Sequence, residues 1–233
     1  QTPPTPGPWR LLRIIDTSAG DVDEDASEPK KRFWKWFVRP RGADDDGSLA
    51  STSAQELAPH LSRAAEAGRR LAAALHLPED ITEAIVACLA WHDLGKNRRI
   101  WQAAIGNGEY STGRVLAKSG GVMRPALLNS YRHELGSLLD VAQHHRGRLA
   151  TIALRDLTMH LIAAHHGRAR PHFPAEELFD PGHPASQCDL AAAEVPDRFA
   201  TLQKKFGRWG LAWLESIVRA ADIIASQAEE EAT

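Results

Sequence analysis

The chain has 233 residues, of which 43% are hydrophobic and 25% are charged, as in a globular protein with one main core. No stretch approaches the roughly 18 consecutive apolar residues of a membrane-spanning helix, and no secretion signal opens the sequence, so we expect a cytoplasmic protein without membrane contact. The two cysteines, Cys88 and Cys188, have no metal-ligand spacing, and the formal net charge of −2 leaves nucleic-acid binding to local basic patches.

Residues 1–53 differ in composition from the rest of the chain. Two runs rich in β-branched and aromatic residues, 7–15 and 31–38, flank an acidic segment at 21–25, which predicts a β-hairpin with an acidic loop. Residues 40–48 combine turn formers with charge, as linkers do. We therefore expect an N-terminal hairpin and acidic linker, compatible with the tail of a preceding helicase region in a longer polypeptide.

From residue 54 onward, Ala and Leu recur at helical spacing, which predicts an all-α fold for residues 54–226. The last residues, 227–233, are acidic and lack an apolar face, which predicts a flexible tail. Residues 97–131 contain several glycines and indicate a loop-rich insertion. The predicted fold class is thus an all-α helical bundle with a small N-terminal β-hairpin.

Two of the predicted helices carry a histidine on an apolar face. In the helix expected over residues 57–75, His60 falls inside the stripe of apolar residues. The next helix is expected to open with a capping box that begins at Asp80 and to close at a left-handed Gly95. Its apolar face includes His92, so both imidazoles are predicted to point toward the core.

Later helices add further groups of the same kind. A helix expected to end at Gly167 places His165 in line with its apolar residues, with His166 at the same end. Near the end of the last helix, Asp222 borders the apolar stripe. A helix is also expected to begin near His133, but its apolar residues lie away from that histidine, so the pattern alone does not turn it inward.

A single histidine on an apolar face is more often a core residue with one hydrogen bond than a metal ligand. When several helices each direct such a group inward, this ordinary explanation is weaker, because burying many polar groups without partners costs on the order of several kcal/mol. A shared metal centre removes this cost, and the adjacent pair His92 and Asp93 lets the carboxylate bridge toward a second ion. About seven ligands suffice for two metals, and mixed imidazole and carboxylate ligands favour Mn, Fe, Co, Ni or Zn over Mg.

The order of His60, the pair His92 and Asp93, and Asp222 resembles the HD superfamily of metal-dependent phosphohydrolases, which are helical bundles. The surrounding residues sharpen the resemblance over about residues 57–226. They are similar to the HD nuclease of type I CRISPR interference, which is associated with or fused to a DExH-type helicase, at Trp91–Lys96, Arg132–Glu134, Ala164–Gly167 and Ala221–Ser226.

This resemblance implies roles for individual residues. One metal would be held by the counterparts of His60, His92, Asp93 and Asp222, and the other by those of Asp93, His133, His165 and His166, with Asp93 bridging. Lys96 matches a lysine beside the metals, so Lys96 and Asp93 are the expected catalytic residues. Without the resemblance, Lys96 would be interpreted as an exposed lysine that follows a helix. The resemblance further implies a deoxyribonuclease in antiviral defence that cleaves single-stranded DNA, with a CRISPR helicase in the same or another chain and a guide-RNA surveillance complex as partners.

Other interpretations remain open. The chain could be a nucleotide phosphohydrolase or phosphodiesterase of the wider HD superfamily, or a non-catalytic helical module. His133 and the pair His165 and His166 favour the nuclease, because a minimal one-metal HD site does not need them. DNA-strand contacts are expected from basic groups at 98–99, 168–170 and 204–209, the last of which a solvated helix face explains equally well. The histidines that compete as ligands are His144, His145 and His160.

Overall fold

The structure is a computed structural model that describes residues 10–16, 33–38, 53–121 and 123–231. By its contacts the chain forms two compact units, residues 1–42 and residues 43–233. The boundaries predicted from composition, at residues 53 and 226, remain predictions. The predicted acidic loop and acidic linker lie outside the described residues.

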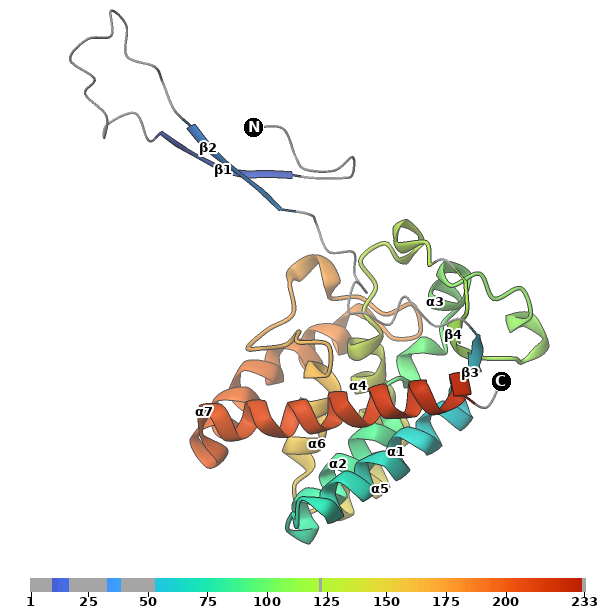
Figure 1. Ribbon diagram of the computed structural model, residues 1–233, viewed down its shortest axis with the longest axis vertical. Helices are drawn as coiled ribbons and strands as arrows, with labels where there is room; N and C mark the ends of the chain where they lie inside the picture. The colour runs from blue at the N-terminus through green and yellow to red at the C-terminus, as the bar shows by residue number, and fades with distance from the viewer. Residues whose placement is uncertain (1–9, 17–32, 39–52, 122, 232–233) are drawn as a thin grey trace, which may run out of the picture. The chain divides into compact units, whose positions relative to one another are not determined.

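The first unit contains a two-stranded antiparallel sheet (Figure 1). Strand β1 (Arg10–Asp16) pairs with strand β2 (Phe33–Val38), from Arg10 opposite Val38 to Asp16 opposite Phe33. Strand β2 lies within the second run of β-branched and aromatic residues, and β1 extends one residue beyond the first run; such residues suit a pleated surface. The predicted N-terminal hairpin strands are therefore confirmed.

The second unit is a helical bundle, which confirms the predicted fold class (Figure 1). Helix α7 contacts both α1 and α6, and α2 contacts both α1 and α6, so these four helices enclose the main core. The helices are α1 (Leu57–Ala74), α2 (Glu79–Trp91), α3 (Arg99–Ala104), α4 (His133–His144), α5 (Arg146–Thr151), α6 (Arg155–Ala164) and α7 (Ala185–Glu231).

Small side chains let α1 and α2 approach closely. Ala64, Ala67 and Gly68 are buried on the face of α1 that meets Ile85 and Leu89 of α2. A methyl group at Gly68 would overlap the side chain of Leu89. The close contact fixes the relative position of the two helices, and both carry residues of the site described below.

The ends of α2 differ from the prediction. The helix begins at Glu79, with Pro78 in the cap position and no side-chain cap, so the predicted capping box at Asp80 is wrong. Pro78 has φ −54° and ψ 148°, which directs the chain into the helix two residues earlier than a cap at Asp80 would. Gly95 is not left-handed either, because it lies inside the 3₁₀ turn η3 (Leu94–Lys96).

The segment 97–131 is more ordered than the predicted loop-rich insertion. It contains α3, the 3₁₀ turns η4 (Tyr110–Thr112) and η5 (Pro125–Leu128), and strand β4 (Leu116–Ser119), which pairs antiparallel with β3 (Ala54–Glu56). This second sheet was not predicted, because strands of three and four residues are too short for a period-2 pattern.

The second sheet holds the end of α7. The side-chain amide of Gln55 donates to the carbonyl oxygen of Ser226 at 3.0 Å, and Lys118 Nζ donates to Ser226 Oγ at 2.7 Å. Ser226 lies one helical turn beyond Asp222. The sheet therefore fixes the part of α7 that carries a predicted ligand.

The last two predicted helices are longer or more broken than expected. The helix expected to end at Gly167, which its pattern places from about residue 149, is interrupted, since α5 ends at Thr151 and α6 begins at Arg155. Gly167 lies just beyond α6 and has a left-handed φ of 77°. Helix α7 is broken at Gly207, whose φ of 73° and ψ of 163° suit glycine. Within the described residues, no helix has both the length and the apolar composition needed to cross a membrane.

Candidate metal centre

The structure brings the seven predicted ligand residues into one cluster inside the helical unit. They come from five helices or the turns that follow them, and all but His166 and Asp222 are buried. They are His60 of α1, His92 and Asp93 after α2, His133 at the start of α4, His165 and His166 after α6, and Asp222 of α7.

Asp93 lies at the centre of the cluster, and its two carboxylate oxygens face different histidines. Its Oδ2 is 3.6 Å from His60 Nε2 and 3.4 Å from His92 Nε2. Its Oδ1 is 3.2 Å from His133 Nε2 and 3.7 Å from His165 Nε2. This is the arrangement expected of a carboxylate that bridges two ions.

The first group comprises His60, His92 and Asp93, whose ligand atoms lie within 4.8 Å of one another. Asp222 closes this group, because its Oδ1 is 3.0 Å from His60 Nε2 and 3.6 Å from His92 Nε2. The group thus offers two imidazoles and two carboxylates, a donor set that suits a divalent transition metal.

The second group comprises Asp93, His133, His165 and His166, again with ligand atoms within 4.8 Å of one another. The Nε2 atoms of His133 and His165 are only 3.2 Å apart. The rings of His165 and His166 have centroids 4.1 Å apart. Three imidazoles and a carboxylate at one point again form a donor set typical of a transition metal.

Helix ends fix the orientation of two of these histidines. His92 follows the last residue of α2, and its Nδ1 donates to the carbonyl oxygen of Leu89 at 2.9 Å. His165 follows α6 in the same way and donates from Nδ1 to the carbonyl oxygen of Ile162 at 2.7 Å. The last carbonyls of a helix have no partner within the helix, so they accept these bonds. With Nδ1 protonated, each Nε2 presents a lone pair to the cluster.

The charges of the cluster depend on burial and on neighbours. Burial opposes ionisation of Asp93, yet His92 and Lys96 hold the pKa of its carboxyl well below the usual value. Burial, together with His166, lowers the pKa of His165 to about 3. Near neutral pH Asp93 is therefore a carboxylate and His165 a neutral imidazole, which are the forms that bind metals.

The residues present fit a metal. The Nε2 atom of His92 and the Oδ1 atom of Asp93 are buried and form no hydrogen bond of good geometry with the described residues. Buried polar atoms of this kind are costly unless something binds them. Imidazole nitrogens that converge on shared carboxylates are the partners a divalent cation requires.

Lys96 lies inside the site and not on the surface. Its side chain is 4% exposed, and Nζ is 2.8 Å from Asp93 Oδ2. The ammonium also lies 5.1 Å from the centre of the Trp101 ring, and the backbone carbonyl of Lys96 accepts a 2.8 Å hydrogen bond from Gln102 Nε2. The alternative of an exposed lysine after a helix is thus wrong, because η3 and α3 enclose the side chain.

A glycine brings Asp93 and His133 together. A side chain at Gly95 would overlap the backbone carbonyl of His133, so only glycine allows η3 to lie directly against the start of α4. The backbone N–H of Gly95 donates to Ser137 Oγ at 2.8 Å, and its carbonyl accepts from the Tyr131 hydroxyl at 2.7 Å. This contact explains why His133 is buried although the apolar pattern of α4 does not include it.

The competing histidines lie outside both ligand groups. His144 is exposed, and the ring of His145 stacks on Trp91 at 5.1 Å. His160 is buried, but its Nε2 is 2.7 Å from Glu215 Oε1, a partner that accounts for its burial. These histidines therefore have ordinary structural positions.

Sequence reasoning assigned no role to Glu134, which the structure buries completely next to His133. The quoted motif Arg132–Glu134 contained it, but a charged residue in the first turn of a helix is ordinarily a solvated or dipole-stabilising residue. Only the packing of η3 and α4 shows that this carboxylate is inside the protein.

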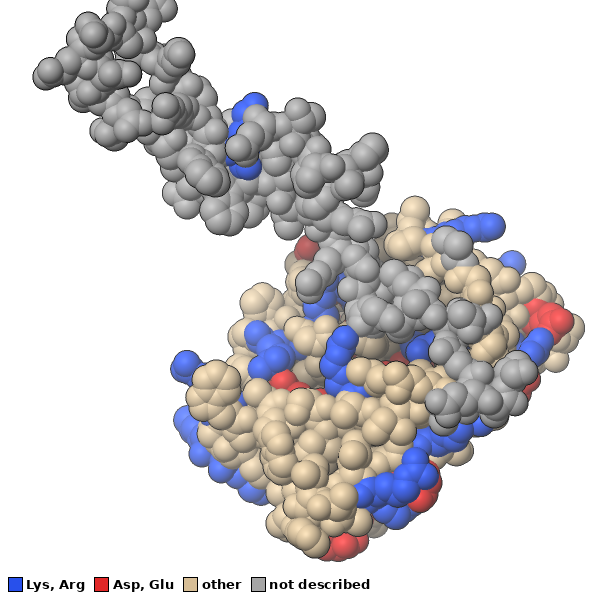
Figure 2. Space-filling model, viewed as in Figure 1, with Lys and Arg blue, Asp and Glu red and all other residues tan. Residues whose placement is uncertain are grey.

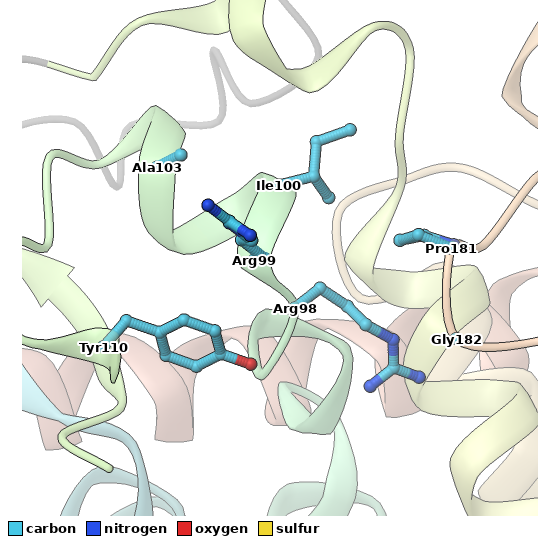
Figure 3. A pocket seen from close by; sticks show the side chains of 7 residues that line it. All are labelled: Arg98, Arg99, Ile100, Ala103, Tyr110, Pro181 and Gly182. Carbon is cyan, nitrogen blue, oxygen red and sulfur yellow. The ribbon is translucent and has the colours of Figure 1, made fainter. Parts of the chain in front are cut away.

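The segments predicted to contact the DNA strand differ in whether their basic side chains form ion pairs. Arg98 is engaged by Asp140 at 2.7 Å and by Asp180 at 3.0 Å. Arg99 is exposed and forms no ion pair with the described residues, and it lines an open pocket of about 470 Å³. Figure 3 shows Arg99 and Tyr110 on one side of this pocket, opposite the loop at 181–182.

In the other two segments, Arg170 lies 3.0 Å from Glu215 and Arg168 lies 3.7 Å from Glu177. Lys204, Lys205, Arg208 and Trp209 are exposed, and Trp209 is 84% exposed. Figure 2 shows basic side chains beside a hollow on one face of the helical unit. Basic groups are therefore available at several places on the surface.

The comparisons with known proteins now add an independent finding. The model of the family described as "Cas3, HD domain" matches residues 50–230. No curated protein and no solved structure shows a significant match. The family match covers most of the chain and includes every residue of the cluster. The chain therefore belongs to the Cas3 HD-domain family, the metal-dependent HD nucleases of type I CRISPR interference.

Proposed function

We propose that this chain cleaves phosphodiester bonds of single-stranded DNA with two divalent transition-metal ions that share Asp93. The observation that carries the proposal is the division of the Asp93 carboxylate, with Oδ2 toward His60 and His92 and Oδ1 toward His133 and His165. A single-ion site would not need imidazoles on both sides of one carboxylate.

The two groups described above would hold the ions. His60, His92, Asp93 and Asp222 would hold one, and Asp93, His133, His165 and His166 the other. When bound, such ions supply Lewis acidity that activates water and stabilises charge on the phosphate. Mixed imidazole and carboxylate ligands favour Mn, Fe, Co, Ni or Zn.

Lys96 would act on the substrate phosphate. Its buried ammonium lies 2.8 Å from Asp93, so it carries a fixed positive charge at the edge of the cluster. A preorganised cation stabilises negative charge that develops on phosphate oxygens without reorganising at the moment of reaction. We therefore assign Lys96 to transition-state stabilisation and Asp93 to the bridging position.

The DNA strand would be held by cations outside the cluster. Arg99 projects from the start of α3, three residues after Lys96, and its guanidinium is exposed. Such a group can bind the phosphate of a strand that reaches the cluster. The exposed basic and aromatic residues at 204–209 offer a second contact of the same chemistry.

The partners follow from the same proposal. The sequence contains no GxxxxGK[ST] phosphate loop, so ATP-driven unwinding would come from a CRISPR helicase, in the same polypeptide or another chain. A guide-RNA surveillance complex would then deliver the DNA target, in antiviral defence inside the cytoplasm.

The test is cleavage by metal-reconstituted protein of circular single-stranded DNA, run beside a panel of free nucleotides. We expect the circle to be cut with Mn²⁺, no need for ATP, and loss of activity in excess chelator. Hydrolysis of a free nucleotide with no cutting of the circle would favour the small-nucleotide phosphohydrolase instead. Cleavage that persists unchanged in excess chelator would contradict the metal mechanism.

A further inference from the structure

A histidine binds a metal through one ring nitrogen only if the proton is held on the other nitrogen. In the cluster, His92 and His165 achieve this with the carbonyl oxygens of Leu89 and Ile162, each three residues earlier in the helix that ends there. Both histidines can use this device because they follow a helix.

His133 cannot use the same device, because it is the first residue of α4. The residue three positions earlier, Ser130, belongs to a turn with φ 64° and not to a helix. The Nδ1 atom of His133 instead lies 3.4 Å from Oε2 of Glu134, the next residue along the chain.

Glu134 is an unusual residue in its surroundings. It is fully buried, and neither carboxylate oxygen forms a hydrogen bond with the described residues. The nearest guanidinium, that of Arg132, is 4.0 Å away and makes its closer contact, 3.0 Å, with Glu177. A buried carboxylate of this kind is costly, so its position calls for an explanation.

Glu134 and His133 are both shielded from solvent, since each side chain is 0% exposed. A carboxylate 3.4 Å from Nδ1 attracts a proton to that nitrogen.

We propose that Glu134 is a positioning residue that holds the proton of His133 on Nδ1, so that Nε2 faces the Asp93 side of the cluster with its lone pair. The inference rests on the proposed two-ion function, since His133 belongs only to the second ligand group. At the start of α4, the Glu134 carboxylate thus holds the histidine proton on Nδ1, as the backbone carbonyls do at the ends of α2 and α6.

The experiment reads the tautomer directly. In ¹⁵N-labelled protein without metal, long-range ¹H–¹⁵N correlation spectra distinguish a proton on Nδ1 from one on Nε2 for each histidine. We expect His133 to carry its proton on Nδ1 in the wild type and to move toward the Nε2–H form in Glu134→Leu. His92 and His165 should keep the proton on Nδ1 in both proteins, because backbone carbonyls hold them.

Metal titration gives the second readout. By calorimetry with Mn²⁺, Glu134→Leu should weaken the second ion about 10- to 100-fold and leave the first unchanged, the range found when an outer-shell partner of a ligand is removed. Glu134→Gln keeps the shape and one acceptor oxygen, so His133 should remain largely in the Nδ1–H form and the second ion should weaken less.

The matched control is Glu215→Leu, which removes another buried glutamate that contacts a histidine, His160, outside the cluster. It should change neither the His133 tautomer nor the affinity of either ion. A wild-type His133 with its proton on Nε2, or a Glu134→Leu protein that keeps Nδ1–H, would overturn the inference. Should Glu134→Leu fail to fold, the wild-type spectrum alone still decides, because a His133 proton on Nε2 in that protein overturns the inference.

These outcomes separate the inference from the proposed function. If the wild type binds one ion only while the tautomer shifts as expected in Glu134→Leu, the two-ion function fails and the positioning role of Glu134 stands. If two ions bind and the tautomer does not shift, the function stands and the role of Glu134 fails.

Discussion

The two sides of the metal cluster are built in different ways. On the first side, His60 lies in the first turn of α1 and Asp222 lies in α7 beyond its break at Gly207, while His92 follows the end of α2. On the second side, His133 begins α4, and His165 and His166 follow the end of α6. Asp93 lies between them in the turn after α2 and contacts both.

This difference affects how each side is held in place. A side chain within a helix, such as His60 or Asp222, is fixed by the packing of that helix, as Gly68 allows for α1 against α2. A side chain at a helix end is fixed by single contacts, such as the approach of Gly95 to His133 and the hydrogen bond from His165 to Ile162. We therefore expect substitutions to affect the two sides separately, except at Asp93.

The largest effect should follow Asp93→Ala, because this change removes a ligand from both sides at once. We expect loss of bound metal from at least one position and no detectable cleavage of single-stranded DNA. Elemental analysis of purified protein together with a cleavage assay measures both. His144→Ala changes an exposed histidine outside the ligand groups and should leave metal content and rate unchanged.

Equal metal content in the wild type and in Asp93→Ala would contradict the shared carboxylate. That result would mean that the two sides bind independently or that only one binds.

The next effect compares the two sides directly. His60→Ala should weaken the ion of the first side, and His133→Ala the ion of the second, since each residue belongs to one group only. Both variants should lose metal and cleavage rate together. Titration with Mn²⁺ should show one remaining binding event in each variant, at the second side in His60→Ala and at the first side in His133→Ala. If both variants lose the same ion, the two sides are not separate.

The sequence predicted the first side better than the second. The apolar stripes of α1 and α2 include His60 and His92, and both are buried as expected. His133 could not be found by this pattern, because its burial depends on η3 and Trp101 from the segment 97–131. Only the family resemblance placed it in the site.

Sequence patterns did not predict the burial of residues whose position depends on tertiary contacts. The buried position of Lys96 depends on Asp93 and Trp101, and neither periodicity nor composition reports such contacts. Glu134 gave no signal at all, since an acidic residue in the first helical turn is common on surfaces. The capping box expected at Asp80 is wrong because Pro78 occupies the cap position and the helix begins at Glu79.

A smaller effect is expected at Lys96, which touches Asp93 but belongs to neither ligand group. Lys96→Met keeps most of the buried volume and removes the charge, so metal content should stay at the wild-type level. The cleavage rate should fall roughly 10²-fold, the scale seen when one electrostatic donor is removed from an active site. A wild-type rate under saturating metal would remove Lys96 from the site.

The smallest effect is expected at Arg99, an exposed cation that belongs to neither side of the metal cluster. Arg99→Ala should weaken binding of single-stranded DNA modestly and reduce the salt dependence of log K by about 0.7, the value for one phosphate contact. Fluorescence anisotropy at several salt concentrations measures this. Arg69→Ala, on the exposed face of α1 beside Glu66, is the matched control and should leave the slope unchanged; equal slopes in all three proteins would mean that Arg99 does not contact the strand.

The central claim is that the two sides share Asp93 and so hold two neighbouring ions. Electron paramagnetic resonance of the protein loaded with Mn²⁺ tests it most directly, because two Mn²⁺ ions joined by one carboxylate interact magnetically. We expect two Mn²⁺ per chain with the spectrum of an interacting pair, which Asp93→Ala abolishes. Two bound ions with the six-line spectrum of isolated Mn²⁺, or one ion per chain at saturation, would contradict the account.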